Sequence, residues 1–148
     1  LINSTYYKKH IIIPSVIEHL PFPQEALYEA VRLLRPGGEL IIQAPNPVFP
    51  IDLHTGLPNP FFIPRFARKT FLNSLGYSYW LTNVYSHPKE KHLTKWLNGA
   101  MELMGVRKVV YPSHFVPKRV RAIYNFLAKA RFFNLVPLSY FYVYRKVQ

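Results

Sequence analysis

The hydrophobic pattern of the first 45 residues predicts a strand, a helix and a second strand. Ile11-Ile12-Ile13 is a short β-branched run, which is typical of a strand buried on both faces of a parallel sheet. After Pro23, which suits the first turn of a helix, apolar residues recur at helical spacing. Pro36-Gly37-Gly38 is expected to end this helix, because glycine adopts the left-handed cap conformation. Glu39–Ala44 is then a second strand, and the segment forms a βαβ unit with parallel strands.

The rest of the chain alternates between predicted helices and strands after a long loop. Six prolines in Pro45–Pro64 disfavour regular hydrogen bonding, and long ordered loops in compact domains are often functional. The predicted helices are Arg65–Leu75, ended by Gly76, then His92–Met104, ended by Gly105, and Val120–Phe132; the predicted strands are Val106–Tyr111 and Leu138–Val147. We therefore expect a three-layer α/β half-domain whose sheet contains Ile11–Ile13, Leu40–Ile42, Val106–Val110 and Phe141–Tyr144.

Composition narrows the class of protein. The chain has 148 residues, of which 49% are hydrophobic and 16% aromatic, so a disordered tail is excluded and one domain is expected. The absence of cysteine excludes a disulfide scaffold, a zinc finger, an iron–sulfur site and a cysteine nucleophile. A reducing cytosol fits this composition best. The sequence begins at Leu1 without a signal peptide, and we expect it to be a piece of a longer cytoplasmic protein.

Charge is distributed unevenly along the chain, which carries a formal net charge of +12. Residues 1–64 contain four basic and five acidic residues, a net charge of −1. Residues 65–148 contain fifteen basic and two acidic residues, a net charge of +13. This asymmetry indicates an anionic partner for the second half, such as a phosphate-bearing substrate, a membrane surface or nucleic acid. The alternative is a solvated surface that is merely basic.

Three segments carry a family resemblance. Val16–Asn46, with the sequence VIEHLPFPQEALYEAVRLLRPGGELIIQAPN, places Glu-His-Leu, Pro-Gly-Gly and Pro-Asn between predicted strands. Together with FPIDLHTGLPNPFFIPR at Phe49–Arg65 and YFYVYRK at Tyr140–Lys146, it resembles class I S-adenosylmethionine-dependent methyltransferases of the methyltransferase domain type 11-like group. One departure is Lys9, where the family usually has an aspartate.

The resemblance implies a partial Rossmann-like methyltransferase sheet, strands four to seven, with flanking helices. The implied strand order is 4-5-7-6, with the last strand antiparallel and inserted between its neighbours. The family's first half holds a Gly-rich turn and a ribose-binding acid, and the sequence has no Gly-x-Gly pattern. We therefore interpret residues 1–148 as the C-terminal part of one methyltransferase domain, without its cofactor-binding N-terminal half and inactive alone.

The implied cofactor, S-adenosylmethionine, would lie beyond the carboxyl ends of the strands. The candidate contacts, mainly through backbone atoms, are Pro14, Ser15, Val16, Glu18 and His19. For Glu18 and His19 the alternative is a structural role, in which His19 hydrogen-bonds its own turn. Some quinone O-methyltransferases place a metal on a Glu-x-x-Glu-His cluster, but Ser15 occupies the first glutamate position here, so no metal is expected.

The Pro-rich loop is expected to cover the methyl acceptor. His54 is the candidate catalytic residue, because an imidazole can take a hydroxyl or amine proton near neutral pH. The candidate acceptor-binding residues are Asn46, His54, Gly56, Phe61 and Phe62. The alternative for His54 is a histidine that fixes the loop conformation.

The predicted function is transfer of a methyl group to an unidentified small or lipid-like acceptor. One alternative is a non-catalytic basic module that binds a membrane or nucleic acid, in which five cations surround an amphipathic helix with Phe126, Phe132 and Phe133. Such a helix favours peripheral contact with an anionic membrane. The five cations are Lys118, Arg119, Arg121, Lys129 and Arg131. The sequence contains no nucleic-acid-binding motif, and we do not expect nucleic acid as the partner. A further alternative is an inactive methyltransferase remnant.

His54→Ala distinguishes the two roles of His54 in a polypeptide extended upstream of Leu1. For a general base, we expect turnover to fall about 10²–10⁴-fold with little change in cofactor affinity. For a loop-fixing histidine, the free energy of unfolding falls by about 1 kcal/mol instead. Steady-state kinetics and thermal melts separate the two outcomes, and unchanged turnover in a normally folded variant contradicts a catalytic role.

Overall fold

The computed structural model describes residues 7–46, 48–49, 65–76, 88–110, 112–116, 118–119 and 121–147. The chain divides into two compact units. The first, here called the sheet unit, comprises Leu1–Pro45, Tyr85–Arg107 and Ser139–Gln148. The second, here called the helical unit, comprises Asn46–Val84 and Lys108–Leu138. In the described part of the chain, no helix has the length and apolar character that crossing a membrane requires.

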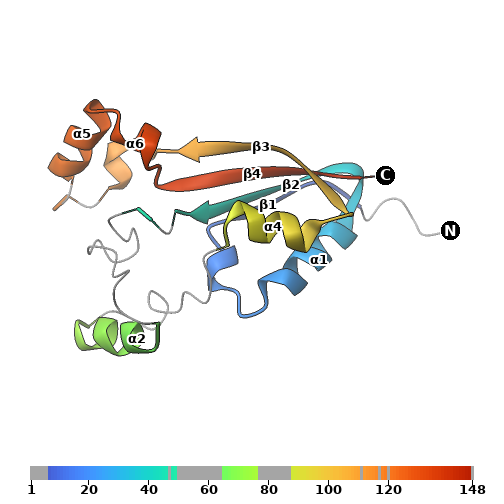
Figure 1. Cartoon of the computed structure of the whole chain (residues 1–148), viewed down its shortest axis with the longest axis horizontal. Helices are drawn as coiled ribbons and strands as arrows, with labels where there is room; N and C mark the ends of the chain where they lie inside the picture. The colour runs from blue at the N-terminus through green and yellow to red at the C-terminus, as the bar shows by residue number, and fades with distance from the viewer. Residues whose placement is uncertain are drawn as a thin grey trace. The chain divides into compact units, whose positions relative to one another are not determined.

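The four strands of the described residues form one sheet in the order β1-β2-β4-β3 (Figure 1). They are β1 (Lys8–Pro14), β2 (Leu34–Pro45), β3 (Met101–Val109) and β4 (Ser139–Lys146). β1 pairs in parallel with β2, and β4 pairs antiparallel to β2. The predicted parallel neighbours and the inserted antiparallel last strand are therefore both confirmed, and the α/β fold class with them.

The boundary between the helix and the second strand differs from the prediction. Helix α1 (Pro23–Leu33) begins at a proline as expected but ends before the Pro-Gly-Gly motif, and β2 begins at Leu34. The β1–β2 register jumps from Lys8↔Leu34 to His10↔Glu39, so the glycines lie in an irregularity of β2 rather than in a helix cap. Gly37 has φ +71°, and a Cβ on Gly38 would lie 2.9 Å from the Arg35 carbonyl oxygen. Only glycine fits both positions without strain.

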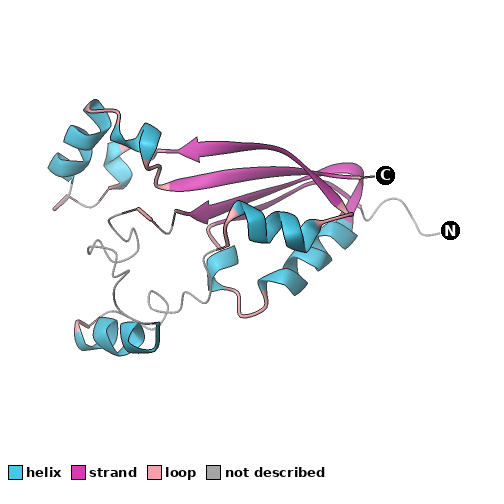
Figure 2. Cartoon of the chain, in the orientation of Figure 1, coloured by secondary structure: helices cyan, strands magenta, loops and turns pink. Residues whose placement is uncertain are grey.

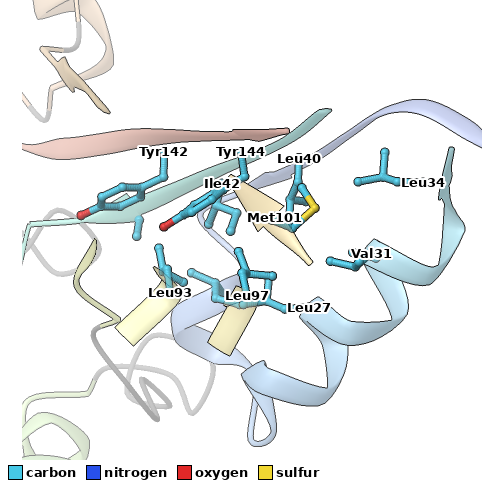
Figure 3. Close-up of a cluster of buried hydrophobic side chains, with 13 residues drawn as sticks. Leu27, Val31, Leu34, Leu40, Ile42, Leu93, Leu97, Met101, Tyr142 and Tyr144 are labelled. Atoms are coloured by element: carbon cyan, nitrogen blue, oxygen red, sulfur yellow. The ribbon is translucent and has the colours of Figure 1, made fainter. Parts of the chain in front are cut away.

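The core of the sheet unit lies between one face of the sheet and two helices, α1 and α4 (Glu90–Leu97) (Figures 2 and 3). Leu27 and Val31 of α1 and Leu93 and Leu97 of α4 pack against the sheet. The sheet contributes Leu40 and Ile42 from β2, Met101 from β3, and Tyr142 and Tyr144 from β4. The alternation of these strand residues follows from the two-residue period of a β-strand.

The first strand is not buried on both faces, as its isoleucine run predicted. Ile11 and Ile13 pack against the core, whereas Ile12 on the opposite face is 60% exposed. The strand register places Ile12 beside Ile41 and Ile41 beside Val143, so an apolar row crosses this second face. Within the sheet unit, both described helices of four or more residues contribute to the core on the other face.

The predicted helix His92–Met104 was wrong in its second half. Helix α4 ends at Leu97, and Met101–Val109 is β3, which also contains Gly105, the expected helix end. Met101 is buried and Leu103 packs against the core, while Glu102 and Met104 are exposed. This alternation has a period of two, but Leu97, Ala100, Leu103 and Met104 also match helical spacing, and the sequence signal was therefore ambiguous.

The helical unit contains a second, smaller core. Its described elements are α2 (Arg65–Ser74), the 3-10 turn η3 (Ser113–Phe115), α5 (Arg121–Lys129) and α6 (Phe132–Leu135). The predicted helix Val120–Phe132 is thus interrupted, because Arg131 adopts a left-handed conformation with φ +55°. After this break, the Phe133 side chain packs in a buried cluster with Phe49, Val116, Tyr124 and Leu138. The Tyr124 and Phe133 ring centroids are 4.7 Å apart.

Tyr142 makes the stability of the sheet unit sensitive to high pH. Its side chain is 4% exposed, and burial raises the pKa of its phenol from 10.0 to about 12. The folded chain keeps this proton up to about pH 12, whereas the unfolded chain loses it near pH 10. The contribution to stability is therefore complete below pH 10 and is lost as pH rises from 10 to 12.

We expect the free energy of unfolding to fall across this pH window, and to fall less steeply in Tyr142→Phe. Denaturant titrations at a series of pH values measure the slope. Tyr28→Phe, which removes a phenol that is 51% exposed, is the matched control and should keep the slope of the parent. Identical slopes in Tyr142→Phe and the parent would contradict the assignment.

Candidate functional site

A strained turn lies at the carboxyl end of β1. Ser15 has φ +47°, a left-handed conformation that residues other than glycine rarely adopt and that often marks functional sites. Its backbone N–H donates to the Gln43 carbonyl oxygen at 3.1 Å, which ties the turn to β2. Pro14 and Val16 on either side are exposed. The turn therefore presents backbone and apolar surface beyond the ends of the two parallel strands.

The next residues form the short 3-10 turn η2 (Ile17–His19). Glu18 is fully buried, and the His19 Nε2 atom lies 3.9 Å from Glu18 Oε1. The His19 backbone N–H donates to the Val16 carbonyl oxygen at 2.9 Å. The buried Glu18 side chain has no exposed surface with which to touch a ligand. Its burial therefore favours a structural role over contact with the cofactor. Cofactor contact by Glu18 and His19 stays a prediction.

A buried polar pair that the sequence analysis did not predict lies at the carboxyl end of β2. Gln43 Nε2 donates to Ser139 Oγ of β4 at 3.4 Å, and the two residues are 7% and 1% exposed. Buried polar groups normally require such partners. The signal available in the sequence was a single amide in the otherwise apolar run Leu40–Ala44.

Asn46, a predicted acceptor-binding residue, has a structural role in the helical unit. Its Nδ2 donates to the Pro137 carbonyl oxygen at 2.7 Å, and its Oδ1 accepts from the Val48 backbone N–H at 3.2 Å. Its own backbone N–H donates to the Leu138 carbonyl oxygen at 2.8 Å. Asn46 is 5% exposed, so these bonds are shielded from water. Contact between Asn46 and an acceptor stays a prediction.

The other acceptor candidates, His54, Gly56, Phe61 and Phe62, lie outside the described residues, as does most of the loop Pro45–Pro64. Their roles stay predictions. Among the residues that the structure does describe, no group of three or more His, Asp or Glu side chains is placed to hold a metal ion.

Asn46→Ala should lower the free energy of unfolding by about 1–3 kcal/mol, because it leaves the buried Pro137 carbonyl without this donor. Asn46→Asp keeps the acceptor for Val48 but loses the donor, and should be at least as destabilising. Asn125→Ala, at an exposed position of α5, is the control and should stay within about 0.5 kcal/mol of the parent. Chemical denaturation measures all three variants, and equal stability of Asn46→Ala and Asn125→Ala would contradict the structural role.

Two curated proteins match the chain in sequence. A demethylmenaquinone methyltransferase of Paenarthrobacter aurescens is 33% identical over 81 residues, which cover 53% of this chain and 32% of that protein. A tRNA U34 carboxymethyltransferase of Syntrophotalea carbinolica is 30% identical over 93 residues, which cover 56% of this chain and 29% of that protein. The matched region thus spans about a third of the length of these relatives. No protein-family model matches the sequence.

Two solved structures are also similar. The MccD protein aligns with 99% of this chain and 63% of its own, with a TM-score of 0.46 and 11% identity. A SAM-dependent methyltransferase from Archaeoglobus fulgidus aligns with 95% of this chain and 60% of its own, with a TM-score of 0.42 and 18% identity. The curated relatives, together with the observed mixed sheet and its flanking helices, confirm the predicted likeness of this chain to the Rossmann-like fold of class I S-adenosylmethionine-dependent methyltransferases.

Proposed function

We propose that this chain is the C-terminal part of an S-adenosylmethionine-dependent methyltransferase that acts on a small or lipid-like acceptor. The observation that carries the proposal is the sheet order β1-β2-β4-β3, with parallel β1 and β2 and an inserted antiparallel β4. This order matches the one that the sequence resemblance implies. Of the two curated relatives, the demethylmenaquinone methyltransferase supports the same reaction class, and the other is a carboxymethyltransferase.

The second face of the sheet, on which Ile12 is exposed and Ile41 and Val143 are half-buried, supports the proposal that a first half completes the domain. The apolar row Ile12–Ile41–Val143 crosses this face, and Ile12 is 60% exposed. Strands of parallel α/β sheets are normally covered on both faces. Helices from an upstream half would bury this row.

The residues at the carboxyl end of β1 fit the proposed cofactor. S-adenosylmethionine supplies a methyl group on a sulfonium centre, to which an acceptor is aligned in line with the departing sulfur. Ser15 holds the backbone in a turn that opens beyond the sheet, and exposed Pro14 and Val16 offer apolar surface beside it. These residues would hold and orient one side of the cofactor, while the Gln43–Ser139 pair ties the end of β2 to β4.

A general base is required only where the acceptor bears a proton at the start of the reaction. His54 remains the candidate for that role. The variant His54→Ala tests the proposed acceptor-binding part of the site. It does so independently of the proposed cofactor-binding residues around Ser15.

The 148-residue chain alone should bind S-adenosylmethionine weakly or not at all, because the Gly-rich turn and the ribose-binding acid of the family have no counterpart in its sequence. Isothermal titration calorimetry checks this, and a dissociation constant in the low micromolar range, about −8 kcal/mol, would refute the proposal of a missing half. In a polypeptide that includes the upstream half, we expect binding and transfer of a radiolabelled methyl group. Failure to bind the cofactor there would refute the methyltransferase proposal.

Ser15 provides a matched pair for the same measurement in the extended polypeptide. Ser15→Gly keeps the left-handed turn available and should preserve cofactor affinity, whereas Ser15→Val disfavours φ near +47° and should weaken it. Thermal melts report whether Ser15→Val still folds. Equal cofactor affinity of the two folded variants would remove Ser15 from the proposed site.

A further inference from the structure

The helical unit concentrates the positive charge of the protein. It contains nine basic residues and one acidic residue, a formal net charge of +8. Its stretch Lys108–Leu138 has six Lys and Arg residues and no Asp or Glu. The cations of this stretch therefore have no acidic neighbour along the chain to neutralise them.

Two of these six cations stabilise the unit itself. The Arg121 Nη2 group donates to the carbonyl oxygens of Val116 and His114 at 3.0 and 3.3 Å. Lys108 Nζ donates to the Asn134 carbonyl oxygen at 2.6 Å. The other four, Lys118, Arg119, Lys129 and Arg131, are exposed. They remain available to an anionic partner.

Large apolar side chains are exposed beside these cations. Ile123 and Phe126 of α5 are 57% and 69% exposed, and Leu135 at the end of α6 is 81% exposed. Phe132 and Phe133, which the sequence placed on an interfacial face, instead pack within the unit, and Phe133 is only 3% exposed. The interrupted helix thus places Phe132 and Phe133 within the unit and leaves Ile123, Phe126 and Leu135 exposed.

Helix geometry places the exposed residues on one side of α5. Phe126 follows the buried Tyr124 by two positions, which is about 160° around a helix. Ile123 and Lys129 lie three positions before and after Phe126 and so neighbour it on the surface. We name Ile123, Phe126 and Lys129 the outer face of α5. This helix is therefore apolar toward its own core and apolar again toward solvent, with a cation at the edge of its outer face.

We propose that the helical unit docks on an anionic membrane surface through the outer face of α5. Apolar side chains at this position can enter the boundary between headgroups and acyl chains while Lys and Arg contact lipid phosphates. The aliphatic Ile123 and Leu135 favour lipid over nucleic acid, because bases stack on aromatic rings rather than on aliphatic chains. The inference rests on the helical unit alone and holds whether or not the chain is part of a methyltransferase.

Co-sedimentation of the full 148-residue chain with vesicles tests the proposal. We expect binding to phosphatidylcholine vesicles that contain about one third phosphatidylserine, little binding to pure phosphatidylcholine, and weaker binding at high salt. Ile123→Ser/Phe126→Ser should reduce binding at least about tenfold. Phe22→Ser, which removes a 66% exposed aromatic from the sheet unit, is the matched control and should bind like the parent.

A second pair of variants isolates the charge contribution. Lys118→Gln/Lys129→Gln should weaken binding several-fold, whereas Lys91→Gln/Lys95→Gln removes the same charge from exposed positions of α4 and should have a smaller effect. Thermal melts confirm that each variant folds. Equal binding to neutral vesicles, an unchanged affinity of Ile123→Ser/Phe126→Ser, or binding to single-stranded RNA without binding to vesicles would each overturn the proposal.

Discussion

The parallel pairing of β1 with β2 is the constraint on which the rest of the sheet unit depends. A parallel pair requires a crossover that returns the chain to the same end of the sheet, and α1 provides it. Burial of Leu27 and Val31 against Leu40 and Ile42 holds this crossover in place. The pairing brings the ends of β1 and β2 to one edge, and so fixes where Ser15 and Gln43 lie.

Gly37 and Gly38 lie at the other end of the strand pair from Ser15. They show how closely the backbones of β1 and β2 approach each other there. The register jump between Lys8 and His10 leaves four residues of β2, Arg35–Gly38, outside its regular pairing with β1. A side chain on Gly38 would meet the Lys9 carbonyl oxygen at 3.1 Å. The Pro-Gly-Gly motif is therefore required by the strand pairing rather than by the end of the helix. Because these residues fit the irregular part of β2, the strand can follow α1 directly, without a longer loop.

The second face of the sheet has a mixed character that follows from the same registers. The row His10–Glu39–Arg145 is polar, with the His10 Nδ1 and Arg145 Nη2 atoms 3.4 and 3.3 Å from the Glu39 carboxylate oxygens. The neighbouring row Ile12–Ile41–Val143 is apolar. Exposed ion pairs of this kind contribute little stability in water, so the core beside α1 and α4 provides most of the stability of this unit.

The sequence by itself determined the βαβ unit, the first and last strands of the sheet and the fold class, because β-branched runs and a first-turn proline act locally. It also predicted cofactor contacts in the turn Pro14–His19 and an acceptor site in the loop around His54, and both stay predictions. Only the tertiary structure decided the rest. Residues 97–104 match helical and strand periods alike, and the packing of Met101 and Leu103 selected the strand. The positive φ of Ser15, the burial of Glu18 and the Gln43–Ser139 bond likewise arise between segments distant in sequence, whose meeting no local pattern encodes.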